Sequence, residues 1–306
     1  MLSDTFTLKK LEIFLAFMRS GTLSDAAEKL NMSSVSVHRA IHSLEEELKC
    51  PLFRQEGRLL VPLPTAKVLE EQAEQVIHSL EEAINTTRET AGLYSNLFKL
   101  GALYSLTLTT VPKLIAGLKL RNGDLNIELM LNSNDALLKK LRSFELDAML
   151  IALDDSFDTP EFTTLPLFED DILLAVPRDS ELAQLEAITL AELINPTFVT
   201  LTNGFATFRD SYRVFDQAGF EPNVVMQVSD IFSLISMVGA GVGYALLPKR
   251  VERGFEDKIK LIPIEGQDTV RQKIGMVCLA SRERDPRILS CIAECRAYHR
   301  EHHQPH

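Results

Sequence analysis

Residues 22–44 read TLSDAAEKLNMSSVSVHRAIHSL, and this stretch decides how the first part of the chain folds. Thr22 supplies a hydroxyl that can cap a first short helix, which residues 31–33 then interrupt. A second helix begins at about Ser34 and ends near Pro51, because proline cannot continue a helix. The apolar side chains on one face of this second helix are Val37, Ile41, Leu44 and Leu48. Two short helices separated by a brief turn predict a helix-turn-helix.

The segments on either side of this stretch complete a small domain. Between residues 8 and 20, apolar side chains recur at spacings of three and four, which predicts a supporting helix. Residues 51–62 read PLFRQEGRLLVP, which predicts two short strands around a turn that contains glycine. We therefore expect residues 1–64 to form a winged helix-turn-helix, which places its last helix in the major groove of DNA.

The exposed face of that last helix carries short hydrogen-bonding and cationic side chains, which can reach base edges and phosphates. Two arginines of the wing would lie along the phosphate backbone. The alternative is an ordinary solvated helix face, but such a face more often carries Glu and Lys. The predicted DNA-binding residues are Ser33, Ser34, Ser36, His38, Arg39, His42, Arg54 and Arg58.

The overall charge of the chain points in a different direction. The 306 residues carry a formal net charge of −11, which argues against a protein that coats nucleic acid without regard to sequence. Residues 1–64, however, contain eight Lys and Arg against eight Asp and Glu, so the acidic excess lies in the rest of the chain. No apolar run approaches the roughly 18 residues of a membrane span, and the N-terminus does not read as a secretory signal. We expect a cytoplasmic protein without a membrane partner.

At this point the chain resembles the LysR-type transcriptional regulators. The resemblance rests on residues 14–66, FLAFMRSGTLSDAAEKLNMSSVSVHRAIHSLEEELKCPLFRQEGRLLVPLPTA, and on the order of the later segments. It implies a winged helix-turn-helix, a long dimerisation helix and a two-subdomain α/β effector domain similar to periplasmic binding proteins. It also implies a homodimer that assembles into a tetramer on double-stranded promoter DNA. Ser34, Val35 and Ser36 depart from the usual start of the recognition helix, so the resemblance does not reveal the operator sequence.

A narrower resemblance is to the regulators of malonate-utilisation genes. Three stretches carry it: residues 33–53 (SSVSVHRAIHSLEEELKCPLF), residues 103–121 (LYSLTLTTVPKLIAGLKLR) and residues 165–177 (LPLFEDDILLAVP). This resemblance implies that a small dicarboxylate, plausibly malonate, is the effector.

Residues 65–92 predict a single long helix. Apolar positions alternate four and three residues apart, which is typical of a coiled-coil seam, whereas glutamates fill the other faces. The alternative is an amphipathic helix packed on its own domain, but the family resemblance favours dimerisation. The predicted seam is Leu69, Ala73, Val76, Leu80, Ala83 and Thr87.

From residue 93 to residue 306, short apolar runs alternate with amphipathic segments, which predicts parallel, doubly wound sheets. We expect subdomain I at about 93–167 and 266–306, and subdomain II at about 168–265. The predicted strands are 98–103, 127–131, 148–152, 172–176, 198–201, 224–228, 244–247 and 274–279, and the predicted helices are 111–120, 135–144, 206–218, 230–238 and 286–299.

Several polar junctions follow the predicted strands, where ligands bind to such sheets and helix N-termini present free amides. A plain helix cap explains any single Ser or Asn. Their concentration where the family binds effectors favours a site for a small carboxylate. Arg209 is the closest arginine, so oriented amides would meet most of the ligand's charge. The predicted effector-binding residues are Ser105, Thr107, Ser133, Asn134, Thr202, Asn203, Gly204, Phe205 and Phe232.

The remaining motifs do not support catalysis or metal binding. A G-x-G-x-G run at residues 239–243 follows a helix and leads into a strand, the reverse of a dinucleotide site, so it predicts a tight turn. The acidic clusters at residues 154–155 and 169–171 are predicted to be solvated loops. The histidines His299, His302, His303 and His306 are predicted to form a solvated tail, and the cysteines Cys50, Cys278, Cys291 and Cys295 to remain reduced thiols.

The prediction is therefore a DNA-binding regulator controlled by a small molecule, with no cofactor, no metal and no enzymatic activity. The alternative, from another class, is a small-molecule binding protein or enzyme whose N-terminal helical domain contacts other proteins instead of DNA.

Overall fold

The computed structural model describes residues 6–57, 59–90, 96–266 and 268–302. The chain divides into two compact units, Met1–Ser95 and Asn96–His306, which are described separately below. No helix in the described ranges is long and apolar enough to cross a membrane.

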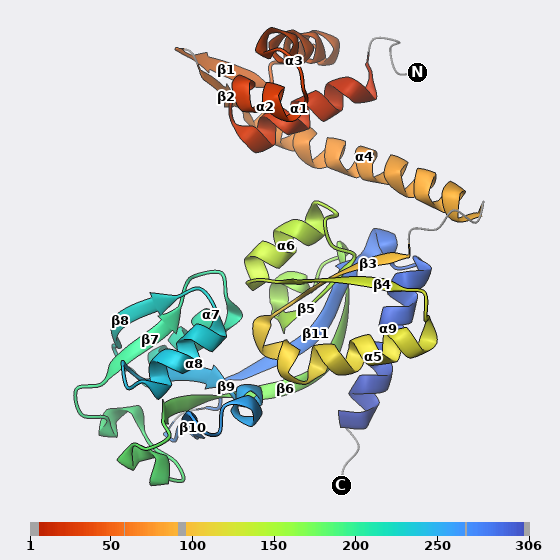
Figure 1. Ribbon diagram of the computed structural model, residues 1–306. Coiled ribbons are helices and arrows are strands. Elements are labelled where there is room, and N and C mark those ends of the chain that lie inside the picture. The colour runs from red at the N-terminus through yellow and green to blue at the C-terminus, as the bar shows by residue number, and fades with distance from the viewer. Residues whose placement is uncertain (1–5, 58, 91–95, 267, 303–306) are drawn as a thin grey trace. The chain divides into compact units, whose positions relative to one another are not determined.

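The first unit has the predicted winged helix-turn-helix (Figure 1). Its elements are α1 (Leu8–Ser20), α2 (Leu23–Lys29), α3 (Ser34–Leu48), β1 (Phe53–Glu56), β2 (Leu59–Pro62) and α4 (Pro64–Thr90). The Thr22 hydroxyl caps α2 by accepting a hydrogen bond from the backbone N–H of Asp25, as its sequence position predicts. The two strands pair antiparallel, with Phe53 opposite Pro62, and so form the expected wing.

Side chains from the end of α3 hold the recognition helix, the wing and α1 together. Glu45 Oε1 accepts backbone hydrogen bonds from Leu52 at 2.8 Å and from Phe53 at 3.0 Å. Glu47 Oε1 lies 2.6 Å from Lys10 Nζ of α1. The Phe53 ring packs edge-on against Phe17, with centroids 5.1 Å apart. The acidic end of α3 therefore fixes the orientation of the wing.

The apolar stripe of α4 has two different environments. Leu69 and Ala73 join the core of the first unit, where α4 packs on α1 and Ala73 is 1% exposed. Val76 and Leu80 continue the same stripe toward the C-terminal end of the helix, but they are 51% and 41% exposed. The prediction that the whole stripe faces a partner is therefore wrong for its first half, because α1 of the same chain covers that part.

The second unit contains two subdomains joined by two long strands. Subdomain I contains β3 (Leu97–Ala102), η1 (Tyr104–Leu108), α5 (Thr110–Arg121), β4 (Asn126–Leu131), α6 (Asn134–Arg142), β5 (Ala148–Leu153), η2 (Asp155–Phe157), η6 (Ala280–Arg282) and α9 (Pro286–His302). Subdomain II contains η3 (Glu181–Gln184), η4 (Leu190–Glu192), β7 (Thr197–Leu201), α7 (Ala206–Gln217), β8 (Asn223–Val228), α8 (Ile231–Gly239), β9 (Ala245–Pro248), η5 (Lys249–Gly254) and β10 (Ile259–Ile262). Elements labelled η are 3-10 helices.

The two joining strands are β6 (Phe162–Pro177) and β11 (Arg271–Leu279), and β11 pairs antiparallel with residues 162–171 of β6 (Figure 1). β3 pairs parallel with β4 and β5, and β7 pairs parallel with β8, as the alternation of strands and helices predicts. β11 runs antiparallel to β5, and β6 runs antiparallel to β9 and β10. The sheet is therefore mixed rather than wholly parallel, because each joining strand crosses from one subdomain to the other.

The glycine run between α8 and β9 is a tight turn, as predicted. Gly241 has a φ of 75°, in the left-handed region that glycine tolerates best. A Cβ on Gly243 would lie 2.9 Å from the backbone oxygen of Thr197, so this position admits only glycine without rearrangement. The run therefore lets β9 approach β7 closely.

Candidate DNA interface and effector site

The predicted DNA-binding residues of α3 occupy one end of the helix, but they do not all have free side chains. Ser33 caps α3: its hydroxyl accepts a hydrogen bond from the backbone N–H of Ser36 at 3.1 Å. The hydroxyls of Ser33 and Ser36 also lie 2.9 Å apart. Both serines therefore stabilise the start of the helix, while Ser34 beside them is exposed.

Three further predicted residues form an exposed row along α3. The rings of His38 and His42 stack edge-to-face with centroids 6.0 Å apart, and His42 Nδ1 lies 4.0 Å from Glu46 Oε1. Arg39 is exposed, and its guanidinium has no carboxylate partner in the part of the chain that the structure describes. This row is free to contact base edges and phosphates.

The wing offers less charge than its sequence predicts. Arg54 forms an ion pair with Glu56 on the same strand, which neutralises it. Arg58 lies outside the described residues. Among the predicted DNA-binding arginines that the structure describes, Arg39 is the one without a carboxylate partner.

The predicted effector residues lie where β3, β4 and β7 end, at the carboxyl edge of the sheets. Ser105, in η1 after β3, is 4% exposed and its Oγ accepts a hydrogen bond from Arg250 Nε at 2.9 Å. The Thr107 hydroxyl instead donates to the backbone oxygen of Tyr104 at 2.6 Å, so it stabilises η1. Of these two η1 residues, Ser105 is the better placed for a ligand.

The junctions after β4 and β7 contact one another. The Ser133 hydroxyl caps α6, and the backbone N–H of Asp135 donates to the Gly204 oxygen at 3.3 Å. Asn134 is 7% exposed and donates to the Ala152 oxygen at 2.8 Å, but its Oδ1 has no partner in the described residues. The start of α6 therefore lies against the loop that follows β7.

Two residues of the β7 junction are engaged locally. The backbone N–H of Thr202 donates to the Val228 oxygen at 2.9 Å, which extends the pairing of β7 with β8. Asn203 Oδ1 accepts from the backbone N–H of Gly204 at 2.8 Å, which supports the φ of 97° at that glycine. These contacts shape the loop that faces α6.

Aromatic side chains close the remaining side of the site. Phe232 packs against Tyr104 with centroids 6.4 Å apart, and Asp230 positions it by capping α8. Burial raises the pKa of Asp230, but hydrogen bonds from Ser233 and from the Phe232 backbone outweigh it, so the pKa lies below its ordinary value. Ser105 and Phe205 line a cavity of about 10 Å³, roughly the space of one water molecule. The full lining is Leu103, Tyr104, Ser105, Leu201, Phe205, Ala206, Thr207 and Ile231.

The structure corrects the prediction about arginines. Arg250, not Arg209, is the arginine beside the predicted site, and its side chain is 7% exposed. Its guanidinium donates to Asp170 Oδ2 at 2.8 Å and to Gln272 Oε1 at 2.9 Å. No local sequence pattern indicates this group, because Arg250 follows a strand of subdomain II and contacts Ser105 only through the fold.

The prediction of solvated loops is wrong for residues 169–171, which lie in a strand, and for Asp154, which is paired, whereas Asp155 is exposed. Asp170 and Asp171 lie in β6, where Asp170 pairs with Arg250 and Asp171 pairs with Arg271 at 2.9 Å. Asp154, after β5, pairs with Arg209 of α7 and so connects the two subdomains. Each of these three carboxylates has an arginine partner far away in the sequence.

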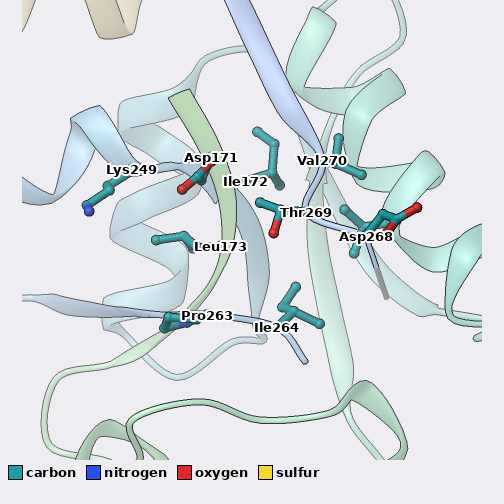
Figure 2. A pocket seen from close by; sticks show the side chains of 10 residues that line it. Asp171, Ile172, Leu173, Lys249, Pro263, Ile264, Asp268, Thr269 and Val270 are labelled. Atoms are coloured by element: carbon teal, nitrogen blue, oxygen red, sulfur yellow. The ribbon is translucent and has the colours of Figure 1, made fainter. Parts of the chain in front are cut away.

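Two other hollows lie in the second unit. One of about 510 Å³ lies between η2, α7 and β11, and its lining mixes four cations with three carboxylates. Figure 2 shows the other, a hollow of about 120 Å³ in subdomain II, where Ile172, Ile264 and Val270 surround Thr269. Neither contains any of the predicted effector residues.

Among the C-terminal histidines and the cysteines, the structure describes His299 and all four thiols in detail. His299 Nδ1 lies 2.8 Å from the Leu167 oxygen, so this histidine is anchored to the fold rather than part of a solvated tail. His303 and His306 lie outside the described residues. Cys278, Cys291 and Cys295 are buried free thiols, and burial raises the pKa of Cys278 to about 12. The described part of the chain holds no group of three potential ligands placed for a metal ion.

A winged helix-turn-helix followed by a long helix and a two-subdomain ligand-binding unit defines an effector-controlled transcriptional regulator of bacterial type. Comparison with known proteins supports the same class of protein. Residues 8–67 match the model of the bacterial regulatory helix-turn-helix proteins of the lysR family, and residues 91–300 match the LysR substrate binding domain. The chain belongs to the LysR family, and it is a DNA-binding regulator rather than an enzyme.

Individual relatives extend along nearly the whole chain. The malonate utilization transcriptional regulator of Klebsiella pneumoniae is 43% identical over 300 residues, which cover 98% of this chain and 97% of the relative. The transcriptional dual regulator GltC of Bacillus subtilis is 27% identical over 281 residues, covering 91% and 93%.

Solved structures share the fold. Full-length OxyR from Pseudomonas aeruginosa has a TM-score of 0.65 at 22% identity, over 95% of each chain. Full-length CbnR in complex with its target DNA has a TM-score of 0.65 at 18% identity, over 96% of this chain and 100% of that one.

Proposed function

We propose that the effector of this regulator is a small carboxylate such as malonate, bound between the subdomains at the ends of β3, β4 and β7. The observation that carries the proposal is the 43% identity, along 98% of the chain, to a malonate utilization transcriptional regulator. The local chemistry supports it, because the buried Ser105 hydroxyl accepts a hydrogen bond from the buried guanidinium of Arg250 and lines a cavity between the subdomains.

The cavity beside Ser105 is smaller than a dicarboxylate, so binding requires the subdomains to separate around β6 and β11. Hinge motion of this kind is common in two-subdomain binding proteins. Effector binding would then shift the equilibrium between two angles of the subdomains.

Isothermal titration of the full-length protein with malonate tests the proposal, with succinate, acetate and shikimate as competitors of other sizes. We expect saturable binding of malonate and a rise in melting temperature, because a ligand that binds only the folded state stabilises it. Binding of another metabolite without any binding of malonate would contradict the assignment.

We further propose that α3 reads the operator through Ser34, His38, Arg39 and His42, with Ser33 and Ser36 shaping the helix start and Arg54 and Arg58 near the phosphates. The exposure of the His38–His42 row supports this assignment. A dimer formed through α4, paired into a tetramer, would place two such helices on the half-sites of one operator. A regulator that binds chromosomal DNA works in the cytoplasm.

A His38→Ala variant tests the base-reading role. We expect it to lose affinity for an operator selected from random DNA while its affinity for scrambled DNA changes little, because base contacts carry the specificity. Fluorescence anisotropy with both DNAs measures the ratio. An equal loss on both would assign His38 to the phosphates instead.

A further inference from the structure

A chain of buried polar side chains lies beside the Ser105 cavity, where β6 and β11 pass between the subdomains. At its centre is Arg250 of η5, with a side chain 7% exposed. Its Nε donates to Ser105 Oγ at 2.9 Å, and its terminal nitrogens donate to Asp170 Oδ2 at 2.8 Å and to Gln272 Oε1 at 2.9 Å. These partners belong to η1, β6 and β11, so one guanidinium ties three elements together.

The guanidinium also fixes the orientation of the Gln272 amide. Arginine only donates hydrogen bonds, so the amide oxygen of Gln272 must face it. The amide nitrogen therefore faces α7, where it donates to Asp210 Oδ2 at 2.8 Å and to Thr207 Oγ1 at 3.3 Å. Gln272 is 2% exposed, and both of its N–H groups are used. Each hydrogen bond in the chain thus has a determined direction, outward from Arg250 to Ser105 at one end and through Gln272 to Thr207 at the other.

That direction decides what the two hydroxyls at its ends can offer a ligand. Ser105 accepts from Arg250, and Thr207 accepts from Gln272. Both residues are nearly buried, at 4% and 6% exposed, and both line the same cavity. Neither hydroxyl proton has an acceptor in the ranges that the structure describes, although a buried hydroxyl normally donates its proton to a partner.

We propose that Arg250 and Gln272 are positioning residues that hold the Ser105 and Thr207 hydroxyls as hydrogen-bond donors toward the effector, so that the site selects a carboxylate over the corresponding amide. A carboxylate presents only acceptor oxygens and matches both donors. An amide also presents N–H donors, which would face the hydroxyl protons of Ser105 and Thr207 instead of acceptors. Such a mismatch in a buried site lowers affinity. The inference rests on the proposed carboxylate effector and adds the groups that would select it.

The test compares malonate with its neutral diamide by isothermal titration of the full-length protein. In the first variant, Arg250→Met is combined with Asp170→Asn, so that no buried carboxylate is left unpaired. We expect malonate affinity to fall about tenfold or more while diamide affinity falls less, so the ratio of the two dissociation constants shrinks. Arg253→Met, an exposed arginine of the same 3-10 helix, is the control and keeps the wild-type ratio.

A second pair of variants leaves the arginine in place. Thr207→Val removes the hydroxyl at nearly constant shape and should weaken malonate binding about tenfold, whereas Thr207→Ser keeps the hydroxyl and restores binding. The inference would be overturned if the Arg250→Met/Asp170→Asn variant kept the wild-type ratio of the malonate and diamide dissociation constants, or if Thr207→Val kept the wild-type affinity for malonate. Either result would leave the proposed effector class standing. A wild-type protein that binds no small carboxylate would overturn the proposed effector class as well, so the two failures are distinguishable.

Discussion

Glu45 performs a structural task that its exposed neighbour Glu46 does not. Its carboxylate accepts two backbone hydrogen bonds at the entry to the wing, from Leu52 and Phe53. We expect Glu45→Ala to lower the free energy of unfolding by about 1–3 kcal/mol, because two partly buried N–H groups lose their acceptor. Urea unfolding of the full-length protein measures the change.

Glu46→Ala provides the matched control, because the Glu46 side chain is 75% exposed and its one contact, with His42 Nδ1, is a long one of 4.0 Å. It should change stability by no more than about 0.5 kcal/mol. If both variants lose the same stability, the link between α3 and the wing does not depend on Glu45.

Asp210 gives a prediction about pH. It is 2% exposed, and burial raises its pKa above the ordinary value despite the Gln272 hydrogen bond and the nearby Arg209 and Arg213. A raised folded-state pKa means that the folded protein binds the proton more tightly. The contribution of Asp210 to stability is then present below its unfolded pKa and is lost as the pH rises through the folded value.

Asp210→Asn keeps an oxygen acceptor for Gln272 and removes the charge. Its stability relative to wild type should therefore be higher at about pH 7 than at about pH 4. Unfolding curves across this range measure the difference, with Asp216→Asn, an exposed position on the same helix, as the control. If the stability difference between Asp210→Asn and wild type does not change with pH, the ionised Asp210 carboxylate does not destabilise the folded protein.

Local sequence patterns predict one side of the proposed effector site but not the other. Ser105 and Asn134 were predicted because each follows an apolar strand and precedes a helical segment, a pattern local in the chain. Arg250 was missed although it follows β9, because its partner Asp170 lies 80 residues away inside a strand. Only the crossing of β6 and η5 brings them together, and no local pattern encodes that crossing.

At the scale of elements, periodicity predicted the helices well and one strand poorly. The segments that became α1, α3 and α4 carry clear helical spacing, and the structure has helices there. β6 was predicted only over 172–176, although it runs from Phe162 to Pro177. The part that was not predicted, residues 162–171, contains a proline and three consecutive acidic residues, which are typical of loops. Arginines from elsewhere in the fold pair with two of those carboxylates and stabilise the strand.

We expect the proposed dimer to form through the exposed half of α4. Val76 and Leu80 are the large apolar seam positions that α1 leaves uncovered, and the smaller Ala83 and Thr87 beyond them are exposed too. We expect Leu80→Glu to shift the protein from dimer toward monomer by at least about tenfold in dissociation constant, because a charge would enter an apolar seam. Analytical ultracentrifugation over a dilution series measures this shift.

Gln75→Glu adds the same charge on an exposed position away from that stripe, and it should leave the dimer intact. Dissociation of both variants to the same extent would indicate general charge repulsion. An unchanged dimer in Leu80→Glu would place the interface elsewhere.

Over the full chain, charge is divided unevenly between the DNA-reading head, residues 1–64, and the remaining residues. Residues 1–64 have no net charge, so the 24 Lys and Arg and 35 Asp and Glu of residues 65–306 account for the total of −11. In addition, Arg54 on the wing pairs with Glu56. A neutral head of this kind gains little from counterion release and should bind random DNA weakly, so specificity depends on two heads at a matched operator.

Glu56→Gln changes that balance at one position. It frees Arg54 and gives the head a net positive charge, so affinity should rise for operator and scrambled DNA alike, and the ratio between them should shrink. The slope of log K against log salt should steepen by about 1, the value for one additional phosphate contact. Glu186→Gln, an exposed change in the second unit, alters the total charge equally and should leave both affinities unchanged. Equal effects of the two variants would mean that the charge of the whole molecule, and not the charge of its reading head, sets the affinity for DNA.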